Sequence, residues 1–464
     1  MADSHGKGGL PLMGLAVAIQ HKLHDQGYHM RARPLIILFT ILNVGFLFWD
    51  PYQTLRNYEL LGFFSPLWVP YIFGRFAFIR FVQSRRANFI ANQNFILLEL
   101  RMPRDSKKTP LAMETIFSAL HVTSGETTWW KKYILGNLRP WFSFEIVSLG
   151  GRIHFYVWLR EGWRRSLESF FYGQYPDMEI IEAEDYSRLV DPVAPGWSRF
   201  GNEFAHTKVD PYPIKTYVDY GLDKAGAEPE EITDPMAQLI EFLGSIGPKE
   251  QLWLQFIIRQ TGGEKYEGMV NKEGKPYTWR DEATAEIDKL RAATVRIMKR
   301  TDPTTGQTIE SEGFPNPSKG QSEMINAIER NISKQGFDVG IRSIYTAPDD
   351  SFQGSMITPI LHSMFKPFNN ESYNGIKLLA KFSAGFNDYP WEDVGMHHRH
   401  HLEELLVEFY RRRCYFHPPY VGPWMVMSSE ELATIYHVPG AHIATPSLPR
   451  IQSATSGAPS NLPT

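Results

Sequence analysis

Cysteine is almost absent from this chain, since Cys414 is the only one in 464 residues. A single cysteine excludes an intrachain disulfide, and this usage is typical of a reducing compartment. The chain also lacks a strong net charge, because its formal charge at pH 7 is −3. Overall basicity therefore does not indicate a nucleic-acid-binding protein. The length and the 43% hydrophobic content are sufficient for more than one domain with a buried core.

Motifs that would identify an enzyme are also missing. The sequence contains no G-x-x-x-x-G-K-[ST] and no H-E-x-x-H. The segment Gly244–Glu250 reads GSIGPKE, but its spacing is wrong for a phosphate loop and it has no Ser or Thr. We expect a helix end and a turn there. The sequence therefore predicts no catalytic residue, no cofactor and no P-loop ATPase activity in this chain.

Long hydrophobic runs are present only near the N-terminus. Pro34–Trp49 is an apolar run of about 16 residues, slightly shorter than the roughly 20 that a spanning helix needs. Leu60–Val82 is long enough but includes two prolines and Arg75. With a polar break between the runs, we predict a transmembrane hairpin over residues 34–82. One pass plus an interfacial helix, and two buried soluble helices, are the alternatives.

Basic residues flank the two apolar runs on their outer sides. Because positive charge favours the cytoplasmic side, this bias predicts that both termini and the soluble domains are cytoplasmic. Tryptophan favours the lipid–water interface. The candidate membrane-anchor residues are Arg31, Arg33, Trp49, Trp68, Arg75, Arg80, Arg85 and Arg86. The segment Trp129–Lys132 (WWKK) also combines aromatic and basic residues, and either rests against a membrane or packs on the protein.

The remaining chain has the pattern of a soluble α+β protein. Residues 95–190 alternate as strand, helix, strand, strand, helix, strand, which is the ferredoxin-like (split βαβ) order. Residues 202–390 resemble a second such unit with a helical insertion, and three of its four strands can be placed, the first at Ile214–Tyr220. The predicted fold class is thus α+β: an N-terminal transmembrane helical hairpin followed by one or two ferredoxin-like units.

Three further segments complete the predicted organisation. Residues 1–33 form a polar or interfacial segment before the hairpin. Residues 391–440 form a C-terminal helical segment, in which Ser428 or Ser429 with Glu431 resembles a capping box. Residues 441–464 form a Pro/Ser-rich tail that we expect to be extended, and that is long enough to reach a partner.

A histidine cluster is the sharpest candidate for metal chemistry. On a helix, His397 and His401 share a face. Two such ligands could begin a zinc site, which needs three or four ligands. The alternative is a solvated helix start. The cluster comprises His397, His398, His400 and His401, followed by Glu403 and Glu404.

A basic-aromatic patch follows on the same predicted helix. Arg411, Arg412 and Arg413 lie between Tyr410 and Tyr415. Such a patch is a candidate site for an anionic partner, either phosphate groups of DNA or an acidic lipid surface. The alternative is a helix C-terminus, where cations interact favourably with the helix dipole.

Several longer strings resemble one family when taken together. They are ILLELRMPRDSKKTPLAMETIFSALH, RPWFSFEIVS, IHFYVW, FPNPSKGQSEMINAIERNISKQGFDVGIRSIY, RRRCYFHPPY and MVMSSEELATIYHVPG. They resemble a membrane-associated domain-of-unknown-function family of candidate-phyla bacteria (Patescibacteria, including Saccharibacteria). In that family the module is similar to the N-terminal part of, or the companion to, type IV secretion and conjugative DNA-translocating ATPases. The resemblance covers most of the chain from Phe95 onward and carries no catalytic residue with it.

The resemblance implies an adaptor at a bacterial inner membrane. We therefore expect a non-enzymatic, membrane-anchored cytoplasmic scaffold for a type IV secretion, pilus-like or DNA-translocating ATPase supplied in trans. The expected partners are membrane lipid and that P-loop ATPase or other secretion components, with DNA and a second copy of the chain as alternatives. A membrane-bound metal-dependent hydrolase using the histidine cluster, and a DNA-binding adaptor using Arg411–Arg413, are the rival functions.

Overall fold

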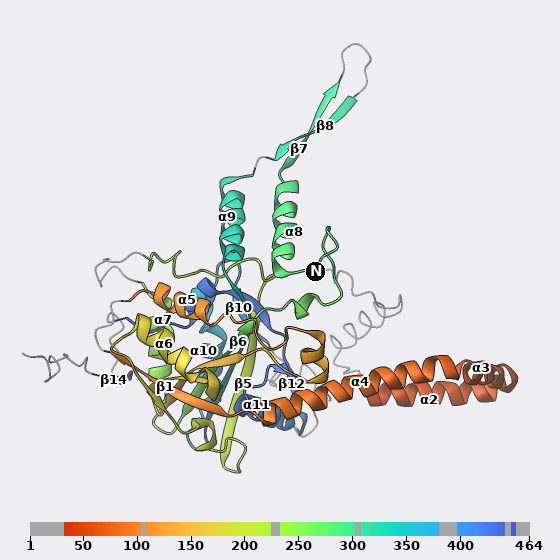
Figure 1. Ribbon diagram of the computed structural model, residues 1–464, viewed down its shortest axis with the longest axis horizontal. Coiled ribbons are helices and arrows are strands. Elements are labelled where there is room, and N and C mark those ends of the chain that lie inside the picture. Colours follow the sequence, from red (N-terminus) through yellow and green to blue (C-terminus); the bar gives the residue numbers. More distant parts are fainter. Residues whose placement is uncertain are drawn as a thin grey trace, which may run out of the picture. The chain divides into compact units, whose positions relative to one another are not determined.

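The computed structural model describes residues 32–103, 108–223, 233–301, 308–315, 317–379, 397–440 and 447–451. These residues divide into two compact units. The described parts of the first unit are residues 32–90, 128–137 and 397–401. The second unit contains the remaining described residues. Figure 1 shows both units as ribbons.

The first unit is built from three consecutive helices, α2 (Ala32–Trp49), α3 (Pro51–Phe63) and α4 (Ser65–Ala91). The predicted polar break between the apolar runs is itself helical. Asp50 begins α3 because its carboxylate accepts a hydrogen bond from the Gln53 N–H at 3.0 Å. The Tyr58 hydroxyl donates to the Asn43 amide oxygen at 2.6 Å and so ties α3 to α2.

The predicted transmembrane hairpin is wrong. Within the described part of the chain, no helix has both the length and the apolar character needed to cross a membrane. The first apolar run is shorter than a bilayer requires. The second lies in α4, a helix of 27 residues that also contains Pro70 and several arginines.

Residues 128–137 belong to the first unit although they lie far from α4 in the sequence. They include a π-helical turn, Trp130–Ile134. Gly136 has a φ of +71°, and a Cβ there would lie 2.5 Å from the backbone carbon of Arg85. The Phe78 and Tyr133 rings also contact each other, with centroids 6.0 Å apart. A glycine thus lets this turn pack directly on the backbone of α4.

The second unit is organised around one large sheet of ten strands. Its strands are β1 (Phe95–Pro103), β2 (Trp141–Leu149), β3 (Arg152–Arg160), β4 (Glu179–Glu182), β5 (Trp197–His206), β6 (Gln251–Gln260), β9 (Gly336–Pro348), β10 (Ile376–Leu379), β13 (Met425–Ser428) and β14 (Arg450–Ile451). All neighbouring strands are antiparallel except β1 and β14. The sheet is therefore large and almost wholly antiparallel.

The strand order divides the sheet into two similar halves. In one half the spatial order is β4-β1-β3-β2, and in the other it is β10-β5-β9-β6. Along the chain, the first strand of each half pairs with the third and the fourth: β1 pairs with β3 and β4, and β5 pairs with β9 and β10. This is the order of a β-α-β-β-α-β unit. The halves join through β2 and β6, which pair along their full length from Trp141↔Arg259 to Leu149↔Gln251.

Two details of the second predicted unit need correction. The segment Ile214–Tyr220, predicted as its first strand, forms turns, and the strand is instead β5 (Trp197–His206). The turn is stabilised by the Asp219 carboxylate, which accepts a hydrogen bond from the Thr216 N–H at 2.9 Å. The two predicted units also share one continuous sheet. The α+β class itself is correct.

Five helices bury one face of this sheet. They are α5 (Pro110–Ala119), α6 (Arg164–Gln174), α7 (Pro235–Gly244), α10 (Gly354–Ser363) and α12 (Ser429–Ile435). Their apolar side chains form one core with the strands. A cross-strand row of this core, in spatial order, is Phe204, Ile341, Phe256, Phe144, Val157 and Leu98. Side chains of successive strand residues point to opposite faces, so the residues next to these lie on the other face.

An arm is inserted between β6 and β9. It consists of α8 (Trp279–Ala292), β7 (Val295–Thr301), β8 (Thr308–Pro315) and α9 (Lys319–Ser333). The two helices pack through Ala283, Ile287, Ile325 and Ile328. The β7–β8 ribbon is separate from the large sheet and extends beyond the ends of both helices (Figure 1). Capping boxes at Thr278 and Ser318 begin the two helices, the first at the base of the arm and the second beside the β7–β8 ribbon.

The C-terminal part of the second unit returns to the sheet. Helix α11 (His397–Arg411) is followed by the short strands β11 (Phe416–His417) and β12 (Tyr420–Val421), which pair with each other. Residues 447–451 lie in the predicted Pro/Ser-rich tail, and within them β14 pairs with β1 through Met102↔Arg450. The rest of that tail lies outside the described residues.

Candidate functional site

The face of the sheet opposite the apolar core carries a continuous row of polar side chains. Strand register places one residue from each of six strands side by side. In spatial order they are Glu203, Arg342, Gln255, Glu145, Tyr156 and Glu99. The four central strands contribute residues that are nearly or completely buried. Buried charge is costly unless it is paired, so this row requires partners from another element.

Arg413 is the main partner of the middle of the row. Its Nε donates to the Glu145 carboxylate at 3.1 Å, its Nη2 donates to Asp185 at 3.0 Å, and its side chain is 1% exposed. Burial by itself would lower the pKa of this guanidinium, but Glu145 and Asp185 outweigh it and raise the pKa well above its usual value. Arg413 is therefore a fixed buried cation, held at a φ of +47°.

Arg342 forms a second buried pair further along the row. Its Nη2 lies 3.2 Å from the Glu203 carboxylate, and both side chains are 0% exposed. The Tyr415 ring covers the guanidinium at 4.9 Å from the ring centroid. A Cβ at Gly340 would lie 2.5 Å from that same ring. The glycine therefore allows the segment after α11 to lie directly on the sheet.

The three arginines of the predicted anionic-partner patch have different environments. Arg411 donates to the Ser187 and Val190 carbonyl oxygens and pairs with Asp191. Arg412 lies just after α11, is exposed, and pairs with Glu408 in the last turn of that helix. Because Arg413 is buried, the structure does not bring the three guanidinium groups to one surface. The contacts of Arg411 and Arg413 hold α11 on the sheet.

The histidine cluster lies at the start of α11. His400 and His401 are exposed, and the side chains of His397 and His398 lie outside the described residues. Among the side chains that the structure describes, no group of three or more His, Cys, Asp or Glu is arranged to hold a metal ion. Glu403 is buried beside Arg199, with a carboxylate oxygen 3.7 Å from Nε.

The candidate membrane-anchor residues also have local partners where they are described. Arg75 donates to the Tyr71 hydroxyl at 3.5 Å, and Arg80 donates to Gln83 at 3.3 Å. The Arg85 guanidinium lies over the Phe81 ring at 5.3 Å. Arg86 is partly buried and Trp49 is 88% exposed. Arg31 and the side chains of Arg33 and Trp68 lie outside the described residues.

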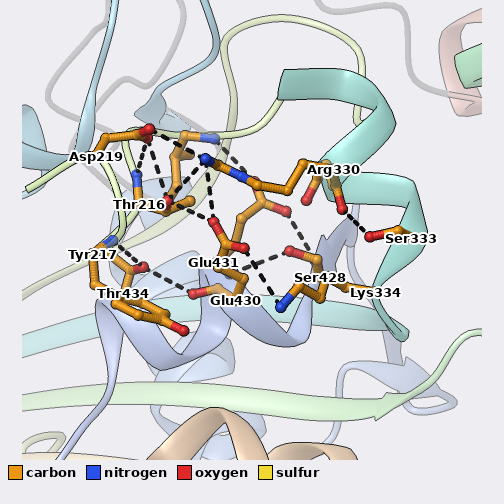
Figure 2. A network of polar contacts seen from close by, with 12 residues as sticks. Thr216, Tyr217, Asp219, Arg330, Ser333, Lys334, Ser428, Glu430, Glu431 and Thr434 are labelled. Carbon is orange, nitrogen blue, oxygen red and sulfur yellow. Dashed lines mark hydrogen bonds and ion pairs between the residues drawn. The ribbon is translucent and has the colours of Figure 1, made fainter. Parts of the chain in front are cut away.

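A second polar cluster, which we call the clasp, joins four segments that are remote in the sequence. They are α5, the turn at residues 214–219, the end of α9 and the start of α12, and Figure 2 shows most of the clasp from close by. The clasp consists of Glu114, Thr216, Tyr217, Asp219, Arg330, Lys334, Ser428, Glu430, Glu431 and Thr434. It lies where the arm leaves the body of the second unit.

Two cations of α9 and the residue after it form the centre of the clasp. The Arg330 guanidinium lies 3.2 Å from both Asp219 and Glu430. Lys334 lies 2.7 Å from Glu114. Both cations are about one-third exposed, whereas Glu114 and Glu430 are buried at 7% and 4% side-chain exposure. The carboxylates of Glu114 and Glu430 are thus more buried than the cations that pair with them. Figure 2 shows Arg330 beside Asp219 and Glu430.

Hydrogen bonds complete the clasp. Thr216 Oγ1 donates to Glu430 at 2.7 Å, and the Tyr217 hydroxyl donates to Glu114 at 2.6 Å. Glu431 caps its own helix through the Ser428 N–H at 2.8 Å and also accepts from the Ile214 N–H at 3.0 Å. Burial raises the pKa of both Glu430 and Glu431 above the usual value.

The polar groups of the clasp bind one another. Its buried carboxylates already accept hydrogen bonds or ion pairs from within the chain, so its chemistry is that of a structural junction. The sequence indicated only the capping box at Ser428 and Glu431. The pairs across the clasp join residues that are remote in the sequence, such as Arg330 and Asp219, which are 111 positions apart, and no local pattern signals them.

The comparison with protein families identifies one family for this chain. Residues 88–450 match the family described as "Domain of unknown function (DUF8128)". This match covers well over half of the chain, so the protein belongs to that family. A comparison with curated proteins finds no match.

Proposed function

We propose that this protein is a non-enzymatic adaptor that presents the α8–β7–β8–α9 arm to a macromolecular partner. The clasp carries this proposal, because Arg330 and Lys334 tie the end of α9 to the buried carboxylates Glu430 and Glu114. Further contacts support α8: the Tyr266 hydroxyl donates to Glu282 at 2.6 Å, and Asn271 donates to Asp281 at 3.1 Å. A rigid base costs a partner less ordering entropy on binding than a flexible one.

The exposed edges of the arm suggest how a partner would bind. The β7–β8 ribbon has only two strands, paired from Val295↔Pro315 to Thr301↔Thr308, and neither pairs with the large sheet. Each strand therefore retains an edge to which another chain can add a strand. From the family resemblance of the sequence strings, the proposed partner is a P-loop ATPase of a type IV secretion, pilus-like or DNA-translocating system, acting in trans. In this proposal, the partner brings the adaptor to the inner face of a bacterial membrane.

Affinity purification of the tagged full chain from its own host tests the proposal. A matched variant replaces residues 295–315 by a short glycine linker between α8 and α9, which retains the helix pair. We expect a P-loop ATPase to copurify with the full chain and to be lost with the variant. Retention of the ATPase by the variant, or ATP hydrolysis by the purified chain alone, would contradict the proposal.

A further inference from the structure

An aromatic and basic surface on the first unit has no role in the proposed adaptor. It is formed by the middle and C-terminal half of α4 together with the turn 128–137. We call it the collar. Its exposed large apolar side chains are Tyr71, Ile72, Phe73, Phe76, Phe78, Ile79, Phe81, Trp129, Trp130 and Leu135. Monomeric proteins rarely expose an apolar surface of this kind without a binding role.

The two tryptophans are the most informative members of the collar. Trp129 and Trp130 are 60% and 59% exposed, although tryptophan is normally a largely buried residue. They lie at the start of the π-helical turn, which Gly136 and Tyr133 pack against α4. The chain therefore holds two large indole rings in solvent on a backbone that is itself firmly packed.

The charged residues of the collar are all basic. The sequence has no Asp or Glu between Leu60 and Asn94, and none between Thr128 and Asn137. The same two segments contain Arg75, Arg80, Arg85, Arg86, Lys131 and Lys132. Arg75, Arg80 and Lys131 are exposed. A partner that covers this surface must offer both an apolar layer and negative charge.

The geometry points to the collar as a docking surface for an anionic phospholipid interface. Indole and phenol rings favour the region between headgroups and acyl chains, and Lys and Arg reach the lipid phosphates with their apolar stems still packed. Each basic residue near an anionic membrane adds to the attraction. In this arrangement the chain binds to the surface of the membrane without crossing it, as interfacial proteins do. This inference is independent of the adaptor proposal, which uses the arm in the second unit.

Vesicle flotation tests the collar with lipid as the probe. The full chain is mixed with vesicles of phosphatidylcholine alone or of phosphatidylcholine with phosphatidylglycerol. We expect it to float with the second kind and to be released by high salt. The variant Arg80→Glu/Lys131→Glu reverses one exposed charge on each element and should weaken this binding about tenfold or more. The control is Lys272→Glu/Lys275→Glu, which reverses two exposed charges of the second unit and should bind as the unchanged protein does.

Brominated lipid gives a second readout that does not depend on charge. Bromine quenches indole fluorescence at the interface, so the Trp129→Phe/Trp130→Phe variant should lose a clear share of the quenching that the unchanged protein shows. Equal binding of the Arg80→Glu/Lys131→Glu variant and the unchanged protein would overturn the inference. Absence of vesicle binding, together with self-association that the tryptophan substitutions abolish, would assign the collar to a second copy of the chain and equally overturn it.

Discussion

Arg413 and Arg330 are both arginines held by two carboxylates, yet they lie in opposite environments. Arg413 is 1% exposed and lies beneath α11, where it neutralises Glu145 in the middle of the sheet. Arg330 is 34% exposed and lies at the edge of the clasp, where water reaches the guanidinium. The same chemical pair should therefore have very different energetic weight at the two sites, because low dielectric strengthens charge interactions and water screens them.

The largest expected effect comes from removing the buried cation. The substitution Arg413→Met keeps much of the side-chain volume but leaves Glu145 and Asp185 without their cation. We expect the free energy of unfolding to fall by about 3–5 kcal/mol, as measured by urea denaturation.

The matched control is the neighbouring Arg412→Met, because Arg412 is exposed and pairs with the half-exposed Glu408 of α11. Its effect should stay within about 0.5 kcal/mol. A loss below about 1 kcal/mol for Arg413→Met would show that the sheet face tolerates unpaired carboxylates, and the distinction between the two sites would fail.

A buried histidine gives an intermediate effect that depends on pH. Both ring nitrogens of His437 face acceptors, the Asp234 carboxylate at 3.0 Å and the Ala433 carbonyl oxygen at 2.9 Å. Both nitrogens must therefore carry a proton to make both bonds. Burial alone would lower the pKa of His437, but Asp234 outweighs it and the pKa is raised. Removal of the pair should cost about 1.5–3 kcal/mol.

The sign of the pH dependence follows from the raised pKa. The unfolded chain has a histidine pKa of about 6.5, so the contribution of the pair is complete below that pH. It is lost as the pH rises through the higher folded pKa. Urea denaturation is measured over a range of about pH 5 to pH 9. The free energy of unfolding should fall more with rising pH for the unchanged protein than for His437→Gln. The exposed His401→Gln is the control, and identical pH curves for all three proteins would refute the charged pair.

The smallest expected effect is that of the clasp. A double-mutant cycle with Arg330→Ala and Glu430→Gln should give a coupling energy of about 1 kcal/mol or less, because Arg330 is partly solvated. The pair Arg291 and Glu329, with both side chains 50% exposed, serves as the reference and should show a coupling close to zero. Urea denaturation of the single and double variants gives both values.

A coupling above about 3 kcal/mol at the clasp would erase the contrast with Arg413. The adaptor proposal predicts in addition that these substitutions loosen α9. Amide hydrogen exchange should therefore rise along α9 while the strands of the sheet keep their protection. Unchanged hydrogen exchange in α9 would show that the clasp does not stabilise the arm.

The sequence indicated the α+β class and the elements of the first half of the sheet well. β1, α5, β2, β3, α6 and β4 all lie within segments whose alternation and turn residues marked them. Gly150 and Gly151 at the β2–β3 turn have φ values of +60° and +81°. Because glycine adopts this conformation readily, the Gly-Gly pair in the sequence indicates the hairpin. The second half was harder, because the arm separates β6 from β9 and because Ile214–Tyr220, which follows β5, alternates like a strand but forms turns.

The N-terminal helices show where hydropathy misled the prediction. The apolar runs of α2 and α4 suggested a membrane hairpin, but the polar break is helix α3 and the described helices do not meet the requirements for a span. The candidate patch at Arg411–Arg413 shows the same limitation. Three adjacent arginines formed one feature in the sequence, while the fold gives each a different partner.

The sequence by itself determined much of the local structure: the strands and helices of the first half of the sheet, the capping box at the start of α12, and the absence of a P-loop motif. Only the tertiary structure decided which charges are buried together. The polar row on the sheet joins six strands, and the clasp joins four remote segments. Such pairs form because burial of a charge demands a partner wherever the fold can supply one, and that choice depends on strand register and helix packing rather than on neighbours in the sequence.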